Sequence, residues 1–364
     1  MSMGKMIERY FIVHTPPHDL CGKYKTSVAA ANFCWPLINS GIFDKTFCIL
    51  PSNVGGLVDD IIMEGLSYSS FRCKGNLLQK IAPFIENWTV FRQIKRGSSV
   101  WFYNIGIINF LLYWLLKIFK PSVRIYVIIL DIYVPKRKFS FPSLILWMMN
   151  HCQGTIRLAN SEFFTCKNSI CMPGVVPSDA PLNPRVEECS MKFLLSGQLR
   201  EDISQTKLVI EAFSRIPNLS LYISGFPVGV SDDELRQLCA PYPNIHYYGN
   251  VEFRKYLELL HECPFFLSTR DPRVVDNQCN FPSKVIEAIL HNRIIISTIH
   301  YGQLNGLKYF EISSSLEEFV DALEHIAKSD SDEILSYANQ TDYVKQRFSP
   351  VEWGNAIIQI ENKE

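Results

Sequence analysis

The sequence predicts an α/β protein made of two doubly wound domains with a cleft between them. Its 364 residues, 47% of them hydrophobic, are enough for two substantial cores. Short β-branched or aromatic runs alternate with longer helical patterns, as in parallel sheets covered by helices. The segment 171–185, CMPGVVPSDAPLNPR, has four prolines and no hydrophobic period, which suits a linker. We therefore place an N-terminal domain at residues 1–180 and a C-terminal domain at 181–348.

Each predicted strand is a short apolar run bounded by turn residues. The first domain has such runs at residues 9–14, 46–50, 99–104, 124–130 and 155–159. The second domain has them at 191–196, 219–224, 245–248, 265–268 and 294–297. A helical spacing resumes after Pro350, and we expect this last segment, 349–364, to form a helix that packs back toward the N-terminal domain.

The composition argues against nucleic acid as a partner and for a reducing compartment. Lys and Arg together number 36, as do Asp and Glu, so the chain has no overall charge excess to attract a polyanion. The 11 cysteines show no CxxC pair, and the N-terminus has no apolar leader with a cleavage site. These features predict free thiols and a cytoplasmic protein.

One apolar segment raises the question of a membrane. Residues 105–119, IGIINFLLYWLLKIF, are too few to cross a bilayer, so we expect a buried helix. A basic cluster follows closely, as expected where a peripheral protein meets anionic lipid. The prediction is possible contact with the inner membrane surface, through a cluster consisting of Lys117, Lys120, Arg124, Lys136, Arg137 and Lys138.

The first predicted strand of the second domain ends in residues 194–200, LLSGQLR. Gly197 there would let a ligand approach the backbone closely. Arg200, and Lys207 at the start of the next helical pattern, would offer positive charge to a phosphate. The alternative is that Arg200 lies in a solvated loop and pairs with a neighbouring carboxylate.

A helix start is well signalled within residues 277–298, NQCNFPSKVIEAILHNRIIIST. Pro282 suits the first turn, and Asn280 suits the N-cap. Lys284, Glu287 and His291 follow at i, i+3 and i+7, on the face opposite the apolar stripe. That stripe consists of Val285, Ile286, Ile289 and Leu290.

The start of this helix predicts a nucleoside diphosphate site. Free N–H groups and a partial positive charge at a helix N-terminus favour an anion, so Ser283 and Lys284 are candidates for binding the diphosphate. Glu287, one turn further on, can accept hydrogen bonds from both ribose hydroxyls. The alternative is an exposed Lys284–Glu287 ion pair worth about 0.2–0.5 kcal/mol.

Further charge lies near the same predicted sheet edge. Arg270 and Arg273 follow the run FFLS and could neutralise a leaving diphosphate, although either could pair with Asp271 or Asp276. We expect no metal and no cofactor, because no zinc-type spacing is found and the one Asp-x-Asp triplet, Asp330-Ser331-Asp332, lies in an acidic stretch that we expect to be a solvated loop. Basic side chains and the helix dipole would then stabilise the leaving group.

The order of these motifs resembles the donor half of family 4 glycosyltransferases, whose GT-B fold consists of two facing Rossmann-like domains. The resemblance covers residues 191–327 and is carried by SGQL, YGNV, DPR and the FPSK motif with its following glutamate. It implies that the C-terminal domain binds a nucleotide sugar and the N-terminal domain an acceptor. The sequence departs from the family pattern at Gln198, where arginine is common, and at Cys279, where glutamate is common.

The resemblance also implies residue roles. Ser283 and Lys284 would contact the diphosphate and Glu287 the ribose, while Arg200 or Lys207 would add a phosphate contact. The nucleobase would lie near Gly249, Asn250 and Val251, and Gly22 would mark the loop over the reaction centre. In the first domain Asp131 stands at a strand end, where it could orient an acceptor hydroxyl or simply cap a helix.

The resulting prediction is a retaining glycosyltransferase that moves a sugar from a nucleotide diphosphate sugar to an acceptor hydroxyl. The expected acceptor is a glycan or lipid-linked glycan in surface polysaccharide or glycolipid biosynthesis. Two alternatives stay open: a nucleotide-sugar 2-epimerase, and a non-catalytic GT-B protein that binds nucleotide or serves as a partner subunit. Gln198 and Cys279 favour the second of these.

Overall fold

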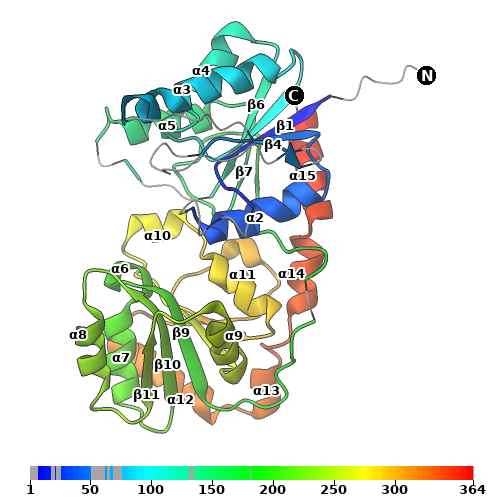
Figure 1. Cartoon of the computed structure of the whole chain (residues 1–364). Helices are drawn as coiled ribbons and strands as arrows, with labels where there is room; N and C mark the ends of the chain where they lie inside the picture. Colours follow the sequence, from blue (N-terminus) through cyan, green and yellow to red (C-terminus); the bar gives the residue numbers. More distant parts are fainter. Residues whose placement is uncertain are drawn as a thin grey trace. The chain divides into compact units, whose positions relative to one another are not determined.

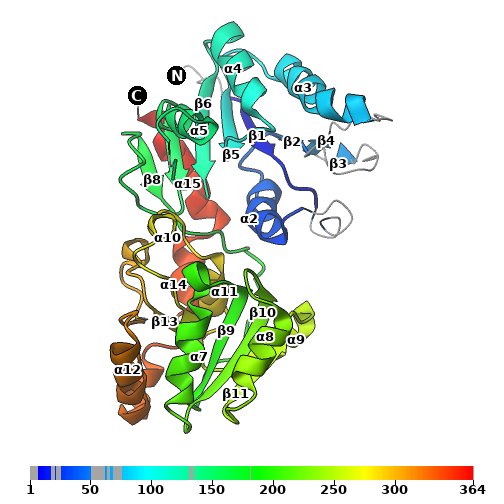
Figure 2. The same ribbon diagram turned by 90° about the vertical axis from the view of Figure 1, so that its left-hand side faces the viewer.

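The computed structural model describes residues 7–17, 21, 26–50, 62–63, 66–68, 76–130, 134–135, 137–180 and 182–363, with side chains from Phe84 onward in its third helix. The chain divides into two compact units. Unit 1 comprises Met1–Ser178 and Phe348–Glu364, and unit 2 comprises Asp179–Arg347. Figure 1 and Figure 2 show a sheet with flanking helices in each unit.

Unit 1 is built on an eight-stranded sheet of order β3-β4-β2-β1-β5-β6-β7-β8, parallel except for the β3–β4 pair. The five predicted strands are present, with ends that differ by one or two residues. The others have only two or three residues and give no sequence period. The strands are β1 (Arg9–Val13), β2 (Lys45–Cys48), β3 (Ile62–Met63), β4 (Leu66–Tyr68), β5 (Ser99–Tyr103), β6 (Arg124–Ile129), β7 (Gly154–Arg157) and β8 (Ser169–Cys171).

Two sets of helices cover this sheet. Tyr10 and Ile12 of β1 face the core formed with α3 (Asn76–Gln93), α4 (Phe110–Phe119) and α5 (Phe141–Asn150). Side chains alternate along a strand, so Trp101 faces the other side, where its indole N–H donates to α15 (Pro350–Asn362). On that side α15 also packs against α2 (Val28–Asn39) through Phe33 and Trp353.

The apolar segment is a core helix, as predicted. Within α4, Leu112, Tyr113, Leu115 and Leu116 are buried against the sheet. None of the described helices has the length and apolar character that crossing a bilayer requires.

Unit 2 is built on a parallel sheet of order β11-β10-β9-β12-β13-β14. The predicted runs 265–268 and 294–297 match β12 and β13 residue for residue, whereas β14 was not predicted. The predicted ends of β9 and β10 were wrong, because Gly197 and Gly225 pair with each other and the strands continue for three residues beyond residues 196 and 224. The strands are β9 (Lys192–Leu199), β10 (Ser220–Pro227), β11 (Ile245–Gly249), β12 (Phe265–Ser268), β13 (Ile294–Ser297) and β14 (Phe310–Glu311).

Helices cover both faces of this sheet. One face forms a core with α7 (Thr206–Ser214), α8 (Asp232–Cys239), α12 (Leu316–Lys328) and α13 (Ser331–Leu335). The other packs against α9 (Phe253–Glu262) and α11 (Ser283–Leu290). The short helices are α6 (Glu201–Ser204), α10 (Val275–Cys279), α14 (Thr341–Arg347) and the 3-10 turn η2 (Gly302–Leu304).

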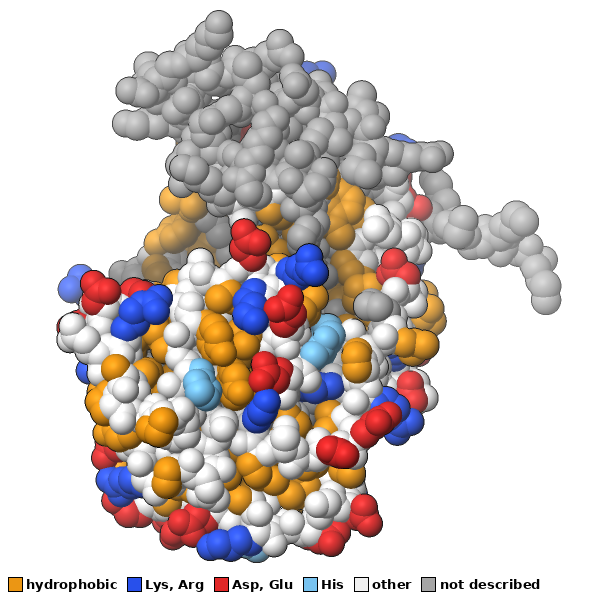
Figure 3. Space-filling model, turned by 60° about the horizontal axis from the view of Figure 1, so that its bottom comes forward, with side chains coloured by type: hydrophobic (Ala, Val, Ile, Leu, Met, Phe, Trp, Pro, Cys, Tyr) orange, Lys and Arg blue, Asp and Glu red, His pale blue; other side chains and the backbone are white. Residues whose placement is uncertain are grey.

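Acidic and basic side chains are interspersed on the described surface in Figure 3. Elsewhere in unit 2 the charges also pair at short range: Arg215 lies 2.8 Å from Glu211, and Lys328 lies 2.8 Å from Glu324. The face drawn in Figure 3 therefore offers no broad basic area of the kind that nucleic acids bind.

Replacing Gly225 with alanine is expected to destabilise unit 2 severely, by on the order of 4 kcal/mol. Its φ is +152°, and an added Cβ would lie 1.9 Å from the carbonyl oxygen of Gly197, which cannot move without breaking the β9–β10 pairing. Gly229→Ala is the matched control, because φ there is +80° with nothing within 4 Å of the added atom, for a cost of about 1 kcal/mol. Urea unfolding would measure both, and equal midpoints would contradict the steric argument.

Candidate functional site

The candidate site lies at the carboxyl edge of the unit 2 sheet, beside β9. From β9 the chain moves outward to β10 and β11, then returns to β12 on the other side of β9. The loops after β9 and β12 therefore diverge at this point, which is where open α/β sheets bind ligands.

Gly197 and Lys284 come together at this edge. Gly197 has a φ of +127°, and the Cδ and Cε atoms of Lys284 lie 3.4 Å from the position that a Cβ on residue 197 would occupy. The lysine chain thus crosses β9 at Gly197, where the strand has no side chain. Gly197 and Lys284, both predicted site residues and far apart in the sequence, therefore lie next to each other.

Lys284 and Glu287 form one cluster with Tyr256 of α9. The ammonium of Lys284 lies 3.6 Å from Glu287 Oε2 and 4.1 Å from the centre of the Tyr256 ring. The Tyr256 hydroxyl donates a hydrogen bond of 3.1 Å to Glu287 Oε2. Burial, together with the neighbouring carboxylate, raises the pKa of Tyr256, so the phenol stays a donor at neutral pH. The alternative prediction, a Lys284–Glu287 ion pair, describes the contact between these two side chains. It does not include Tyr256, which contacts both of them.

The sequence did not predict Tyr256. It is buried in the same stripe of α9 as Leu259 and Leu260, so its spacing is that of a core residue. The only sequence signal was a hydroxyl-bearing aromatic in an otherwise aliphatic stripe.

The predicted cap of α11 was wrong. The helix begins at Ser283 with Pro282 in the N-cap position, while Asn280 terminates α10. Asn280 and Pro282 both have extended backbone, which separates α10 from α11. The N-cap residue Pro282 makes no side-chain cap, and Ser283 at the start of α11 is exposed.

Of the four predicted basic side chains outside α11, Arg270 donates to Asn277 at 3.4 Å, and the other three have local partners or exposed positions. Arg200 forms a two-pronged ion pair with Asp202, which lowers the pKa of that carboxyl group. Arg273 pairs with Asp271 at 2.9 Å and is 85% exposed. Lys207 is exposed in the first turn of α7. The neighbouring-carboxylate alternative therefore describes Arg200 and Arg273 in this structure.

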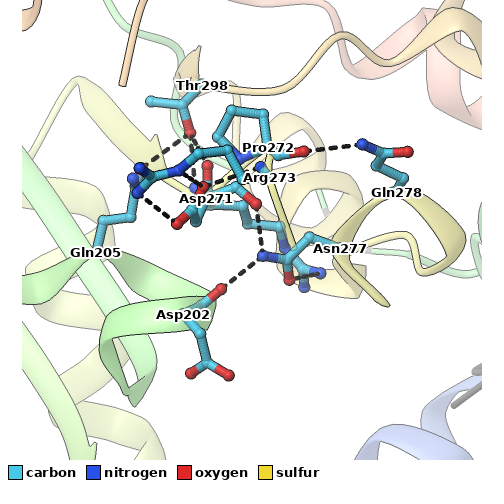
Figure 4. Close-up of polar contacts among 9 residues, drawn as sticks. Asp202, Gln205, Asp271, Pro272, Arg273, Asn277, Gln278 and Thr298 are labelled. Atoms are coloured by element: carbon cyan, nitrogen blue, oxygen red, sulfur yellow. Dashed lines mark hydrogen bonds and ion pairs between the residues drawn. The ribbon is translucent and has the colours of Figure 1, made fainter. Parts of the chain in front are cut away.

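Hydrogen bonds tie the loops after β9, β12 and β13 together (Figure 4). The Thr298 hydroxyl accepts from the N–H of Arg270 at 2.6 Å and lies 3.3 Å from Gln205 Oε1. The Asn277 amide donates to the carbonyls of Asp202 and Asp271. These bonds fix the backbone around the candidate site.

The predicted nucleobase residues lie at the end of β11, the edge strand of the sheet. Gly249 has a φ of +69°, and a Cβ there would lie 3.1 Å from Asp232 Oδ1. Asn250 is exposed and Val251 is half-buried. The nucleobase role stays a prediction.

The first-domain candidates Gly22 and Asp131 lie outside the described residues. Two polar residues occupy strand ends nearby in the chain. Burial lowers the pKa of His14, just after β1, to about 4, so its ring is neutral at pH 7. Asn104, after β5, has a φ of 54° and accepts from the N–H of Leu130, a structural role.

A histidine pair next to this cluster gives unit 2 a predictable pH dependence. His261 Nε2 and His291 Nδ1 lie 2.8 Å apart, and the Arg293 side chain donates to the carbonyls of both residues. Burial lowers the pKa of His291 to about 4 and also lowers that of His261. The unfolded chain binds these protons near pH 6.5, so stability is complete above about pH 6.5 and falls as the pH drops toward 4.

Urea unfolding of unit 2 at a series of pH values between about 7.5 and 4 checks this expectation, because the midpoint should fall with the pH. The double variant His261→Gln, His291→Gln should flatten the decline, whereas the exposed His325→Gln should leave it unchanged. An identical decline in both variants would show that other groups are responsible.

Within the described residues, no group of three or more His, Cys, Asp or Glu side chains is arranged to hold a metal ion.

The architecture is that of the GT-B glycosyltransferases, with a Rossmann-like sheet in each of two units, which confirms the predicted fold. A solved structure described as trehalose-6-phosphate from E. coli bound with UDP-2-fluoro glucose matches with a TM-score of 0.64 and 10% identity, over 98% of this chain and all of the other. A UDP-forming trehalose-phosphate synthase from Burkholderia xenovorans matches with a TM-score of 0.63 and 11% identity, over 98% and 99% of the two chains.

The structure of TarM matches more partially, with a TM-score of 0.56 and 13% identity over 76% of this chain and 57% of the other. No protein-family model and no curated protein sequence matches the chain. At these identities the similarities establish the fold, and they confirm the GT-B resemblance read from the motifs at that level.

Proposed function

We propose that the protein is a retaining glycosyltransferase that uses a nucleotide diphosphate sugar. The observation that carries the proposal is the cluster of Lys284, Glu287 and Tyr256 over Gly197, at the point of the sheet where such folds bind ligands. It supplies one cation for a diphosphate and one carboxylate for a ribose, beside a strand position that has no side chain. A similar structure is described with UDP-2-fluoro glucose bound, and another in terms of glycosyl transfer with retention.

In the proposed reaction the bond between the anomeric carbon and the diphosphate oxygen breaks, and the acceptor oxygen bonds to the same face of that carbon. The departing diphosphate oxygen takes the acceptor proton, and the nucleoside diphosphate leaves. Lys284 and the first turn of α11 stabilise the charge that develops on the diphosphate, without a metal ion. Activity should therefore survive EDTA.

We extend the proposal to the acceptor and the setting. The acceptor is a glycan or lipid-linked glycan used in surface polysaccharide or glycolipid biosynthesis, and the protein works at the cytoplasmic face of a membrane. The support is the basic and apolar segment of unit 1, which lies within the predicted acceptor-binding domain.

A second candidate is a non-catalytic protein that keeps only nucleotide binding. Cys279, at the position where the resembling family commonly has a carboxylate, is 2% exposed, and Arg200 is engaged with Asp202. Both observations remove groups that would otherwise contact a donor sugar.

A panel of nucleotide sugars separates these functions. The protein is incubated with each donor, and nucleotide release, sugar transfer, donor interconversion and binding of free nucleotide are measured. Release with transfer supports the transferase, and NMR of the product gives the anomeric configuration. Interconversion of donors points to a 2-epimerase, and binding without turnover points to the non-catalytic protein. Unchanged donor affinity in Glu287→Ala would overturn the ribose assignment.

A further inference from the structure

The outer side of α3, α4 and α5 exposes many large apolar side chains. These helices cover one face of the unit 1 sheet, and their outer side is turned away from it. Trp88 is 50% exposed, Trp147 46% and Phe139 94%. We call this surface the α3–α5 face, and its exposed apolar residues are Phe84, Ile85, Trp88, Ile107, Ile118, Phe119, Phe139, Phe141, Leu144 and Trp147.

Aromatic contacts make this surface continuous. Phe91 of α3 lies 6.4 Å from Phe119 of α4, measured between ring centres. The rings of Trp114 on α4 and Trp147 on α5 are stacked 6.2 Å apart. The three helices therefore present a single apolar surface, larger than the scattered single residues that are usual on soluble proteins.

The chain that forms this surface is strongly basic. Residues 84–157 contain ten Lys and Arg but only two acidic residues, whereas the whole chain has 36 of each kind. Glu86, one of those two acids, is buried, and Asp131 lies outside the described residues. The exposed basic residues are Arg92, Lys95, Arg96, Lys117, Arg137 and Lys138, and of these Lys95 pairs with Glu8 at 3.0 Å.

The structure corrects the basic cluster predicted from the sequence. Lys120 donates to the carbonyls of Phe91 and Ile94, and Arg124 donates to the carbonyl of Glu361. These two side chains hold unit 1 together, and Lys136 lies outside the described residues. The remaining exposed cations lie on or beside the ends of the three helices.

We propose that the α3–α5 face docks onto an anionic lipid surface. Tryptophan suits the boundary between acyl chains and head groups, and arginine and lysine reach lipid phosphates while their aliphatic stems lie on apolar surface. The positive charge complements anionic head groups, and the exposed aromatic rings complement the boundary between head groups and acyl chains. None of the described helices can cross a bilayer. This inference stands independently of the proposed catalysis.

Vesicle binding of the full chain tests the proposal. Vesicles of phosphatidylcholine mixed with phosphatidylglycerol should bind the protein, vesicles of phosphatidylcholine alone should bind it much less, and added NaCl should weaken binding. Arg137→Gln and Lys138→Gln should each lower the affinity about fivefold. Trp88→Ala with Trp147→Ala should lower it further at every salt concentration.

Matched controls come from unit 2. Arg215→Gln with Lys328→Gln removes two exposed cations, and Leu238→Ala removes an exposed apolar side chain. Neither control should change vesicle binding, and circular dichroism should show that all variants are folded. Equal losses in the controls, or equal binding to neutral vesicles, would overturn the proposal.

Two further readouts decide the occupant of the face. Light scattering of the protein without vesicles should give the same molar mass with and without the Trp88→Ala change. A dimer that this change abolishes would instead assign the face to a second copy of the chain. Nucleotide binding should be the same in all the surface variants. The two proposals are therefore tested separately. Loss of vesicle binding with donor binding intact contradicts only the membrane proposal, and loss of donor binding with vesicle binding intact contradicts only the proposed function.

Discussion

Replacing Lys284 with methionine is expected to lower the rate of sugar transfer about 100-fold or more, with nucleotide binding weakened less. Methionine keeps the length of the side chain over Gly197 but removes the cation that would face the leaving diphosphate. The folded state loses only a half-buried ion pair and a cation–π contact, so its stability should change by about 1 kcal/mol. Initial rates at saturating donor, beside a thermal melt, measure both effects.

Lys328→Met provides the comparison. Lys328 also pairs with a glutamate on its own helix, at 2.8 Å, but it belongs to α12, and the change should leave the rate intact. A Lys284→Met protein with the same turnover as this control would show that the diphosphate is neutralised elsewhere. Nucleotide binding that persists without turnover in the unmodified protein would instead support the non-catalytic candidate.

Replacing Glu361 with alanine is expected to destabilise unit 1 by about 3 kcal/mol. The Glu361 side chain is 3% exposed, and its carboxylate accepts from Arg9 Nε at 2.8 Å and from the indole N–H of Trp101 at 3.0 Å. Arginine 9 is 27% exposed and keeps partial access to water, which places the cost at the lower end for a buried pair. The Trp101 donor, fully buried, would lose its partner.

Hydrogen exchange of the β1 and β5 amides measures this loss within unit 1. Glu324→Ala removes a carboxylate from an exposed ion pair with Lys328 and should cost about 0.5 kcal/mol or less. If both variants protect the β1 and β5 amides equally well, Glu361 does not anchor α15.

The sequence was most informative where a strand is buried on both sides. The runs FFLS and IIIS match β12 and β13 residue for residue. A short, continuous apolar run is typical of a parallel strand that is buried on both faces. At Gly197 the same logic failed. Glycine usually ends a strand, yet here it pairs with Gly225 and the two strands continue past the site.

For the candidate site, the sequence identified residue types but not their contacts. Lys284 and Gly197 were each singled out, but only the folded chain places the lysine over the glycine. Tyr256 was missed because a buried tyrosine in an amphipathic helix has the spacing of a core residue. For Arg200 the sequence left two readings open, and the adjacent Asp202 is the partner that the fold provides.

The return of the C-terminal helix to unit 1 has a consequence for the order of folding during synthesis. Unit 2 is one continuous segment, Asp179–Arg347, whereas unit 1 needs Phe348–Glu364 to be complete. The ribosome makes that last segment about 10 to 40 s after Ser178, at roughly 5–20 residues per second. During that interval Arg9 and Trp101 lack their shared partner, because Glu361 has not yet been synthesised. The first half of the protein to emerge is thus the last to reach its final structure, and a nascent chain halted before Glu361 should expose this part of unit 1 to proteases.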